Sequence, residues 1–183
     1  MSRSSSEAAP VEDPLVDRIK GAHRRFPTGV TIVATEVGGR PYGLAVNAFS
    51  SLSLDPPLVL ACVAATSSTY PRLFEVDALS VSILAADQVD VAAGFARSGG
   101  DKFAAIDWRP GPHGAPILAG VSARLDLRVE HRVPAGTHTI FIGRVLDAEV
   151  GEKPPLVYLG GGFFDGGDLR AAGSASDEKG DQG

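Results

Sequence analysis

Short β-branched and apolar runs, separated by glycine and proline, fill the middle of the chain and constrain its fold more than any other feature. Residues 30–37 form such a run, Gly38-Gly39 is a hairpin-type turn, and residues 40–46 return from it. Further strands are expected at residues 58–63, 78–84, 123–132 and 137–150. Because few helices intervene, we expect a mainly β fold, a closed antiparallel barrel, and not a doubly wound nucleotide-binding fold.

Helices are expected only at the periphery of this barrel. Asp13 is a suitable N-cap and Pro14 a suitable first residue for a helix that ends at Pro27. The apolar face of this helix repeats at helical spacing, through Leu15, Ile19, Ala22 and Phe26. Shorter helices are expected at residues 68–75 and at residues 87–97, the second of them capped by Asp87.

The composition excludes several classes of protein. The chain has 17 lysines and arginines against 22 aspartates and glutamates, and the net charge of −5 disfavours binding to nucleic acid through bulk charge. No apolar run is long enough to span a membrane, and the first residues lack the apolar core of a secretory signal, so we expect a cytoplasmic protein. One domain is expected at residues 13–168, between disordered tails at residues 1–12 and 169–183.

Familiar catalytic motifs are missing from the sequence. It has no glycine-rich dinucleotide loop that opens a helix, no P-loop and no nucleophile elbow. The single cysteine, Cys62, excludes a disulfide framework and a cysteine-rich zinc site. It lies in the apolar run at residues 58–63, which we expect to be buried on both faces, so an inert thiol is expected. The four histidines are scattered, and no metal site is expected.

Two polar segments flank the apolar run at residues 58–63. Residues 46–57 contain Asn47 and end in a double proline, which predicts a rigid extended turn whose amide groups can face a ligand. Thr66-Ser67-Ser68-Thr69 places four hydroxyl residues at the start of a short predicted helix, a combination that binds anions. Each segment alone is compatible with a plain loop or a helix cap. Together they suggest a site for one elongated ligand that carries a phosphate.

Five segments resemble the flavin reductase family, the small reductase components of two-component flavin-dependent monooxygenases. They lie at residues 26–33, 43–59, 101–104 with 107–108, 136–143 and 155–158, and the resemblance covers residues 15–164 in the family's order. It implies a split β-barrel that forms a homodimer and binds FMN or FAD at the subunit interface. It also implies that NADH or NADPH passes a hydride to the flavin, and that reduced flavin diffuses to a separate oxygenase.

The resemblance also implies roles for particular residues. The flavin-binding residues would be Thr28, Ala45, Val46, Asn47, Ala48, Ser51, Cys62, Val63, Ser67, Ser68, Thr69, Lys102 and Phe103. The nicotinamide-binding residues would be Gly43, His138, Tyr158 and Gly160, with His138 as the catalytic residue. Ser68 and Lys102 are assigned to the flavin phosphate.

The chain departs from the family pattern at two places. Ala48 stands where serine is frequent, and Gly160-Gly161-Gly162-Phe163 replaces the usual basic or aromatic residues of the closing strand. Two alternatives stay open: a non-catalytic flavin-binding electron carrier, and an oxidase of the pyridoxamine-phosphate type. The oxidase would need a cluster of arginines and lysines for its substrate phosphate, and none is evident beyond the first helix. Neither FMN against FAD nor NADH against NADPH is decided, although the lack of an arginine cluster favours NADH.

Overall fold

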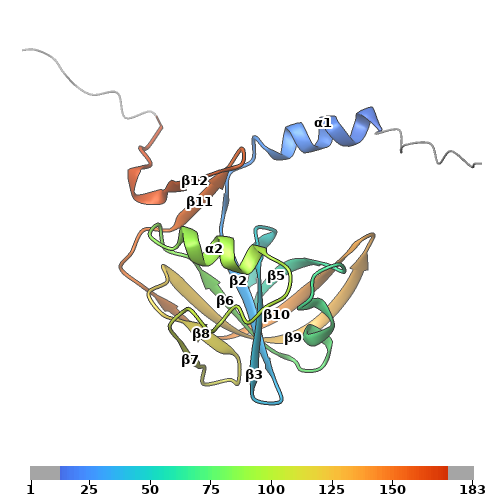
Figure 1. The fold of residues 1–183 in the computed structure, drawn as a ribbon, viewed down its shortest axis with the longest axis vertical. Coiled ribbons are helices and arrows are strands. Elements are labelled where there is room, and N and C mark those ends of the chain that lie inside the picture. Colours follow the sequence, from blue (N-terminus) through green and yellow to red (C-terminus); the bar gives the residue numbers. More distant parts are fainter. Residues whose placement is uncertain (1–12, 173–183) are drawn as a thin grey trace, which may run out of the picture.

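A computed structural model describes residues 13–172 of the 183, and Figure 1 shows a strongly curved sheet with helices around it. The predicted tail at residues 1–12 lies outside the described residues, and so does most of the predicted tail at residues 169–183, of which only residues 169–172 are described. Among the residues that are described, no helix is long and apolar enough to cross a membrane.

Seven antiparallel strands form the main sheet, which confirms the predicted mainly β fold. They are β2 (Thr31–Val37), β3 (Arg40–Val46), β4 (Phe49–Leu54), β5 (Pro57–Ala64), β6 (Ala78–Ile83), β9 (Ala123–Ala135) and β10 (His138–Val150). Their order across the sheet is β3-β2-β6-β9-β10-β5-β4. The predicted hairpin of the two longest strands is present, with His138 opposite Ala135 at its turn.

The two edge strands of this sheet, β3 and β4, are consecutive in the chain. Only Asn47 and Ala48 join them, so the Cα atoms of Val46 and Phe49 are at most about 11 Å apart. The sheet must therefore roll up until its edges approach each other. The edges are not hydrogen-bonded neighbours, so the expectation of a closed barrel was wrong, and the split barrel that the resemblance implied is confirmed.

The link between the edges is shorter than expected. Residues 46–57 were predicted to be one extended turn, but residues 49–54 form β4 and pair with β5. Phe49 packs against the core inside the barrel, whereas most of β4 is exposed, as suits a strand at the edge of a sheet, and its register shifts between Ser51 and Ser53. The Cys62 N–H donates to the Ala48 carbonyl at 2.9 Å and holds the remaining link against β5.

Two clusters of apolar side chains lie on opposite faces of β2. Val33 belongs to the cluster inside the barrel, whereas Ile32 and Ala34 belong to a cluster outside it. The outer cluster is covered by α2 (Val89–Ala96), Phe103 and the small sheet of β7 (Trp108–Pro110) and β8 (Pro116–Leu118). The strand buried on both faces is therefore β2, and the same expectation for residues 58–63 was wrong, because alternate residues of β5 stay half-exposed.

The first helix, α1 (Pro14–His23), begins as predicted, with the Asp13 carboxylate accepting a hydrogen bond from the Leu15 N–H at 2.8 Å. Figure 1 shows that it projects from the barrel beside a small sheet of β1 (Thr28–Gly29), β11 (Leu156–Leu159) and β12 (Gly162–Asp165). No residue of α1 is buried, and Phe26 beyond its end is 71% exposed. The predicted apolar face has no partner within residues 13–172.

The other predicted helices are shorter than expected. Residues 68–75 contain only the 3-10 helix η1 (Tyr70–Phe74), and a second 3-10 helix, η2 (Gly166–Asp168), follows β12. Asp87 does not cap α2, because its carboxylate pairs with Lys153 at 2.6 Å and Gln88 takes the N-cap position instead.

Candidate functional site

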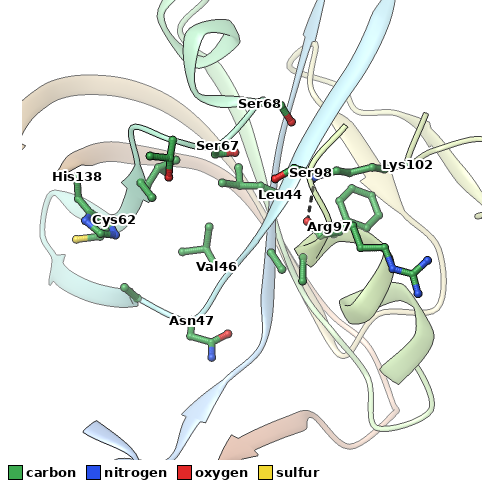
Figure 2. A pocket seen from close by; sticks show the side chains of 17 residues that line it. Leu44, Val46, Asn47, Cys62, Ser67, Ser68, Arg97, Ser98, Lys102 and His138 are labelled. Carbon is green, nitrogen blue, oxygen red and sulfur yellow. Dashed lines mark hydrogen bonds between the residues drawn. The ribbon is translucent and has the colours of Figure 1, made fainter. Parts of the chain in front are cut away.

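A cavity of about 430 Å³, here called the main cavity, lies between the β3–β4 link and the end of α2. Its volume is within the range of small-molecule sites. It is lined by Leu44, Ala45, Val46, Asn47, Ala48, Cys62, Val63, Ala64, Thr66, Ser67, Ser68, Phe95, Ala96, Arg97, Ser98, Lys102 and His138. Figure 2 shows Cys62 and His138 on one side of this cavity and Ser98, Arg97 and Lys102 on the opposite side.

The floor of the main cavity is apolar. Leu44 and Val46 come from the edge strand β3, and Val63 comes from β5, so the floor forms where the two halves of the split barrel meet. Cys62 is half-exposed and lines the cavity, so the expectation of a buried thiol was wrong. The reason is the β5 alternation, which turns Cys62 away from the core that Ala61 and Val63 join. A floor of this kind fits a flat aromatic ring system.

Lys102 provides a cation at the opposite side. Its ammonium group donates hydrogen bonds to the Phe95 carbonyl at 3.0 Å and to the Gly43 carbonyl at 3.2 Å. Partial burial lowers the pKa of Lys102 from its ordinary value of 10.5, because desolvation disfavours the charged form. An ammonium group has three N–H donors, so one more remains for an anion in the cavity.

Gly43 keeps this lysine in place. Its carbonyl accepts hydrogen bonds from Lys102 and from the Thr69 hydroxyl, the latter at 2.8 Å. A Cβ at this position would lie 2.7 Å from the Phe95 ring, so only glycine lets β3 pass so close to α2. Gly43 was predicted to bind the nicotinamide, but in the structure its backbone and its lack of a side chain position Lys102 and Phe95.

The hydroxyl cluster divides between structure and site. The Thr69 hydroxyl is buried against Gly43, whereas Ser67 and Ser68 line the main cavity. The Ser68 oxygen accepts a hydrogen bond from the Gly99 N–H at 3.3 Å, and the Ser67 oxygen accepts one from the Thr69 N–H at 3.2 Å. Both serines therefore keep their O–H donors for a ligand. The donors come from the serines themselves, since the 3-10 helix that follows is too short for a strong helix dipole.

His138 begins β10 and pairs with Ala64 of β5, so both strands hold its backbone. Its side chain is exposed, and its Nδ1 atom lies 3.0 Å from the Thr137 hydroxyl. No carboxylate lines the main cavity with it. The ring can therefore hydrogen-bond or orient a ligand, but it lacks the partner that a strong general base would have.

Two further cavities adjoin the main one. The second cavity, about 670 Å³, shares Asn47 and Ala48 with the main cavity, and the third cavity, about 220 Å³, shares Ser68 and Lys102 with it. The second cavity is lined by His23, Phe26, Pro27, Thr28, Gly29, Thr31, Asn47, Ala48, Phe49, Ser50, Leu60 and Tyr158. The third cavity is lined by Arg40, Pro41, Tyr42, Gly43, Ser68, Thr69, Gly99, Gly100, Asp101, Lys102 and Phe103.

The structure brings most of the predicted site residues together. The main cavity is lined by Ala45, Val46, Asn47, Ala48, Cys62, Val63, Ser67, Ser68, Lys102 and His138. Thr28 and Tyr158 lie in the second cavity, and Gly43 and Thr69 lie in the third. Phe103 is 4% exposed and packs edge-on against Phe95, so it supports the wall of the main cavity from behind.

Two predicted residues lie outside all three cavities. Ser51 is an exposed residue of β4, and Gly160 is in the turn between β11 and β12 with a φ of 63°. Sequence reasoning missed Phe95, Arg97 and Ser98, which line the main cavity. The available signal was the position of Arg97 as the last residue of the predicted helix and of Ser98 directly after it, before two glycines, because side chains at a helix end can face a ligand.

The described residues contain no group of three or more histidine, cysteine, aspartate and glutamate side chains that could hold a metal ion. The main cavity thus combines an apolar floor, one histidine, four hydroxyl side chains and two cations. This donor set suits an organic ligand that carries both a flat ring and an anionic group.

Residues 23–167 match the family described as "Flavin reductase like domain". The chain belongs to this flavin reductase family. The match includes the whole barrel and every residue that lines the main cavity.

Three relatives show how far the likeness extends. The chain is 40% identical over 157 residues, 85% of its length, to two proteins of Rhizobium meliloti (strain 1021). One is named "Probable flavin reductase" and the other "Stachydrine N-demethylase reductase subunit Stc3". The chain spans 50% of the length of the first and 67% of the second. Among solved structures, the NADH:FAD oxidoreductase SgcE6 of Streptomyces globisporus C-1027, in complex with NAD and FAD fragments, has a TM-score of 0.79 at 35% identity, covering 91% of this chain and 99% of that one.

The main cavity of this flavin reductase family member fits a flavin on its own features. The apolar floor of Leu44, Val46 and Val63 suits the ring system, and Lys102 with Ser68 suits the phosphate at the opposite side. The third N–H of Lys102 has no acceptor among the described residues. A phosphate oxygen would provide one.

Proposed function

We propose that this protein is an NAD(P)H-dependent flavin reductase that transfers a hydride from reduced nicotinamide to FMN or FAD and supplies reduced flavin to a separate monooxygenase. One observation carries the proposal: the main cavity has an apolar floor, with a histidine at one side, Lys102 at the other, and the hydroxyls of Ser67 and Ser68 between them. Family membership and the names of the relatives support the same activity.

The flavin itself would supply the hydride acceptor, and the protein would bind and orient the reacting rings. This division of labour explains why no carboxylate lines the main cavity and why no acid–base pair is needed there. Ser67, Ser68 and Lys102 would hold the phosphate, and the β3–β4 link at Asn47 would contact the polar edge of the ring. Holding two rings in a reactive orientation is the larger part of such catalysis.

The nicotinamide would enter from the side of His138 and Asn47. His138 lies across the main cavity from Lys102, so it is on the ring side and not on the phosphate side. The second cavity meets the main cavity at Asn47 and Ala48, and Tyr158 lines it. Of the four predicted nicotinamide residues we retain His138 and Tyr158, because Gly43 and Gly160 lie elsewhere.

We also propose a homodimer in which a second copy covers the apolar side of α1. Leu15, Val16 and Ile19 are between 43% and 51% exposed. Phe26 lies beyond the end of the helix and lines the second cavity, so a partner that covers α1 would also shape this cavity.

Sedimentation velocity at micromolar concentration tests the dimer. Ile19→Ser should weaken it, whereas Arg18→Ser, one position along the same helix, should not. A monomer that still binds flavin would contradict the proposal.

Steady-state turnover tests the activity. The purified protein should oxidise NADH or NADPH only when free FMN or FAD is added, at a rate that saturates with flavin. A non-catalytic electron carrier would bind flavin and leave the nicotinamide unchanged. Adding an oxygenase component of a two-component system then tests hand-over, which should need no stable complex because reduced flavin diffuses. Since the hydride donor is a cellular reduced nicotinamide, we place the reaction in the cytoplasm.

A further inference from the structure

The third cavity continues the main cavity beyond the phosphate side. Ser68 and Lys102 line both, and the hydrogen bond from the Gly99 N–H to the Ser68 oxygen lies at their boundary. A ligand whose phosphate contacts Lys102 would therefore point its far end into the third cavity. FMN ends at this phosphate, whereas FAD continues with a second phosphate, a ribose and an adenine.

The charges around the third cavity favour a second anionic group. Arg40 lines it and makes no ion pair with any residue in the range 13–172. The one carboxylate in the lining, Asp101, already accepts a hydrogen bond from the Phe103 N–H at 3.1 Å. Arg40 and Lys102 thus leave a net positive charge at the place where the second phosphate of FAD would lie.

The third cavity also offers an aromatic surface. Tyr42 lines it, and the Arg72 guanidinium lies over the Tyr42 ring at 5.1 Å from the ring centroid. Arg72 is itself held by Glu75 at 2.7 Å and does not line the cavity. The tyrosine ring is therefore supported from outside the cavity, and a purine can stack on a ring of this kind.

The loop between these groups leaves room for a ligand. Gly99 and Gly100 have φ values of 76° and 74°, a conformation that side chains disfavour, and a Cβ at either position would meet no atom within 4 Å. The backbone of this loop can therefore approach a ligand closely.

We propose that the third cavity binds the adenosine and second phosphate of FAD, with Tyr42 as the stacking partner and Arg40 as the phosphate contact, so that the protein prefers FAD to FMN. This inference rests on the proposed function, because it assumes that the main cavity binds the flavin ring.

Equilibrium binding of FAD and of FMN, followed by quenching of flavin fluorescence, tests the inference without turnover. The wild-type protein should bind FAD at least about tenfold more tightly. Tyr42→Ala should weaken the binding of FAD by about five- to a hundredfold, the range for losing one base–aromatic stack, and leave the affinity for FMN unchanged. Tyr42→Phe keeps the ring and should retain FAD affinity.

The arginine contact has its own control. Arg40→Ala should weaken the binding of FAD and not that of FMN. Arg128 is an exposed arginine of β9 outside the three cavities, so Arg128→Ala should weaken the binding of neither flavin. Equal affinities for FAD and FMN, or equal losses of both in Tyr42→Ala, would overturn the inference and leave the proposed function intact. If neither flavin binds, both the inference and the proposed function are wrong.

Discussion

Lys102→Gln separates the phosphate side of the site from the rest of the fold. Glutamine keeps an N–H donor that can reach one of the two carbonyls now bound by Lys102, those of Gly43 and Phe95. The wall of the main cavity should therefore stay in place. What is lost is the positive charge next to the flavin phosphate.

The expected effect follows from the kind of bond removed. A hydrogen bond between charged groups is worth roughly 1.5–3 kcal/mol, so flavin should bind about tenfold to about 150-fold more weakly. Titration of protein with FMN at neutral pH, followed by fluorescence, measures this change. Lys153→Gln is the matched control, because Lys153 is half-exposed, pairs with Asp87 and does not line the main cavity.

The pH dependence gives a second, independent readout. Desolvation lowers the pKa of Lys102 below 10.5, so its ammonium is lost at a lower pH than that of an exposed lysine. The binding advantage of wild type over Lys102→Gln should be complete below this pKa and should disappear as the pH rises through it. Comparing the two proteins at each pH removes the titration of the flavin itself. Equal FMN affinity of both proteins at neutral pH would refute the phosphate assignment.

Two further sets of variants test separate parts of the structure. Ser68→Ala should weaken flavin binding by about tenfold to a hundredfold, with little change in turnover at saturating flavin. His138→Ala should instead raise the KM for NADH or slow hydride transfer and leave the flavin affinity unchanged. The reverse pattern would mean that the phosphate side and the nicotinamide side of the site are exchanged. Arg124→Ala should lower the free energy of unfolding in urea by about 3–5 kcal/mol at neutral pH, because it leaves the fully buried Asp126 carboxylate without its ion pair. Arg144→Ala, which breaks the more exposed ion pair with Glu130, should lower it by less than about 1 kcal/mol. Burial raises the pKa of Asp126 above 3.8, so the loss of stability in Arg124→Ala should shrink as the pH falls and this carboxyl becomes neutral. A loss of stability that does not depend on pH would show that the unpaired Asp126 carboxylate is not its cause.

The strands were predictable because their signal is local. The β-branched run of β2, the Gly38-Gly39 turn and the long β9–β10 hairpin each depend on residues close together in the chain. The same local pattern could not show that β3 and β4 are the two edges of one sheet, because that depends on the order of all seven strands. The main cavity lies at this junction, so the sequence located Asn47 but not the reason for its importance.

Side-chain surroundings were harder to predict than strands. Cys62 lies in an apolar run, and only the pairing of β5 at one side of the split barrel shows that it faces the cavity. Gly43 resembles a ligand contact in sequence, but Phe95, from an element 52 positions away, determines why it must be glycine. Leu15, Ile19 and Ala22 lie on α1 as predicted, but the helix ends at His23, four residues before the predicted end, so Phe26 lies outside it. Within residues 13–172 nothing covers this apolar face.

Anaerobic single-turnover mixing tests the proposed function most directly. Protein loaded with flavin is mixed with excess NADH or NADPH, and the visible absorption of the oxidised flavin is followed. The proposed function predicts that at least one nicotinamide bleaches the flavin with one nicotinamide oxidised per flavin reduced, and that His138→Ala slows this step more than Ser68→Ala does. Bound flavin that stays oxidised with both nicotinamides would contradict the reductase function and leave only a flavin-binding role.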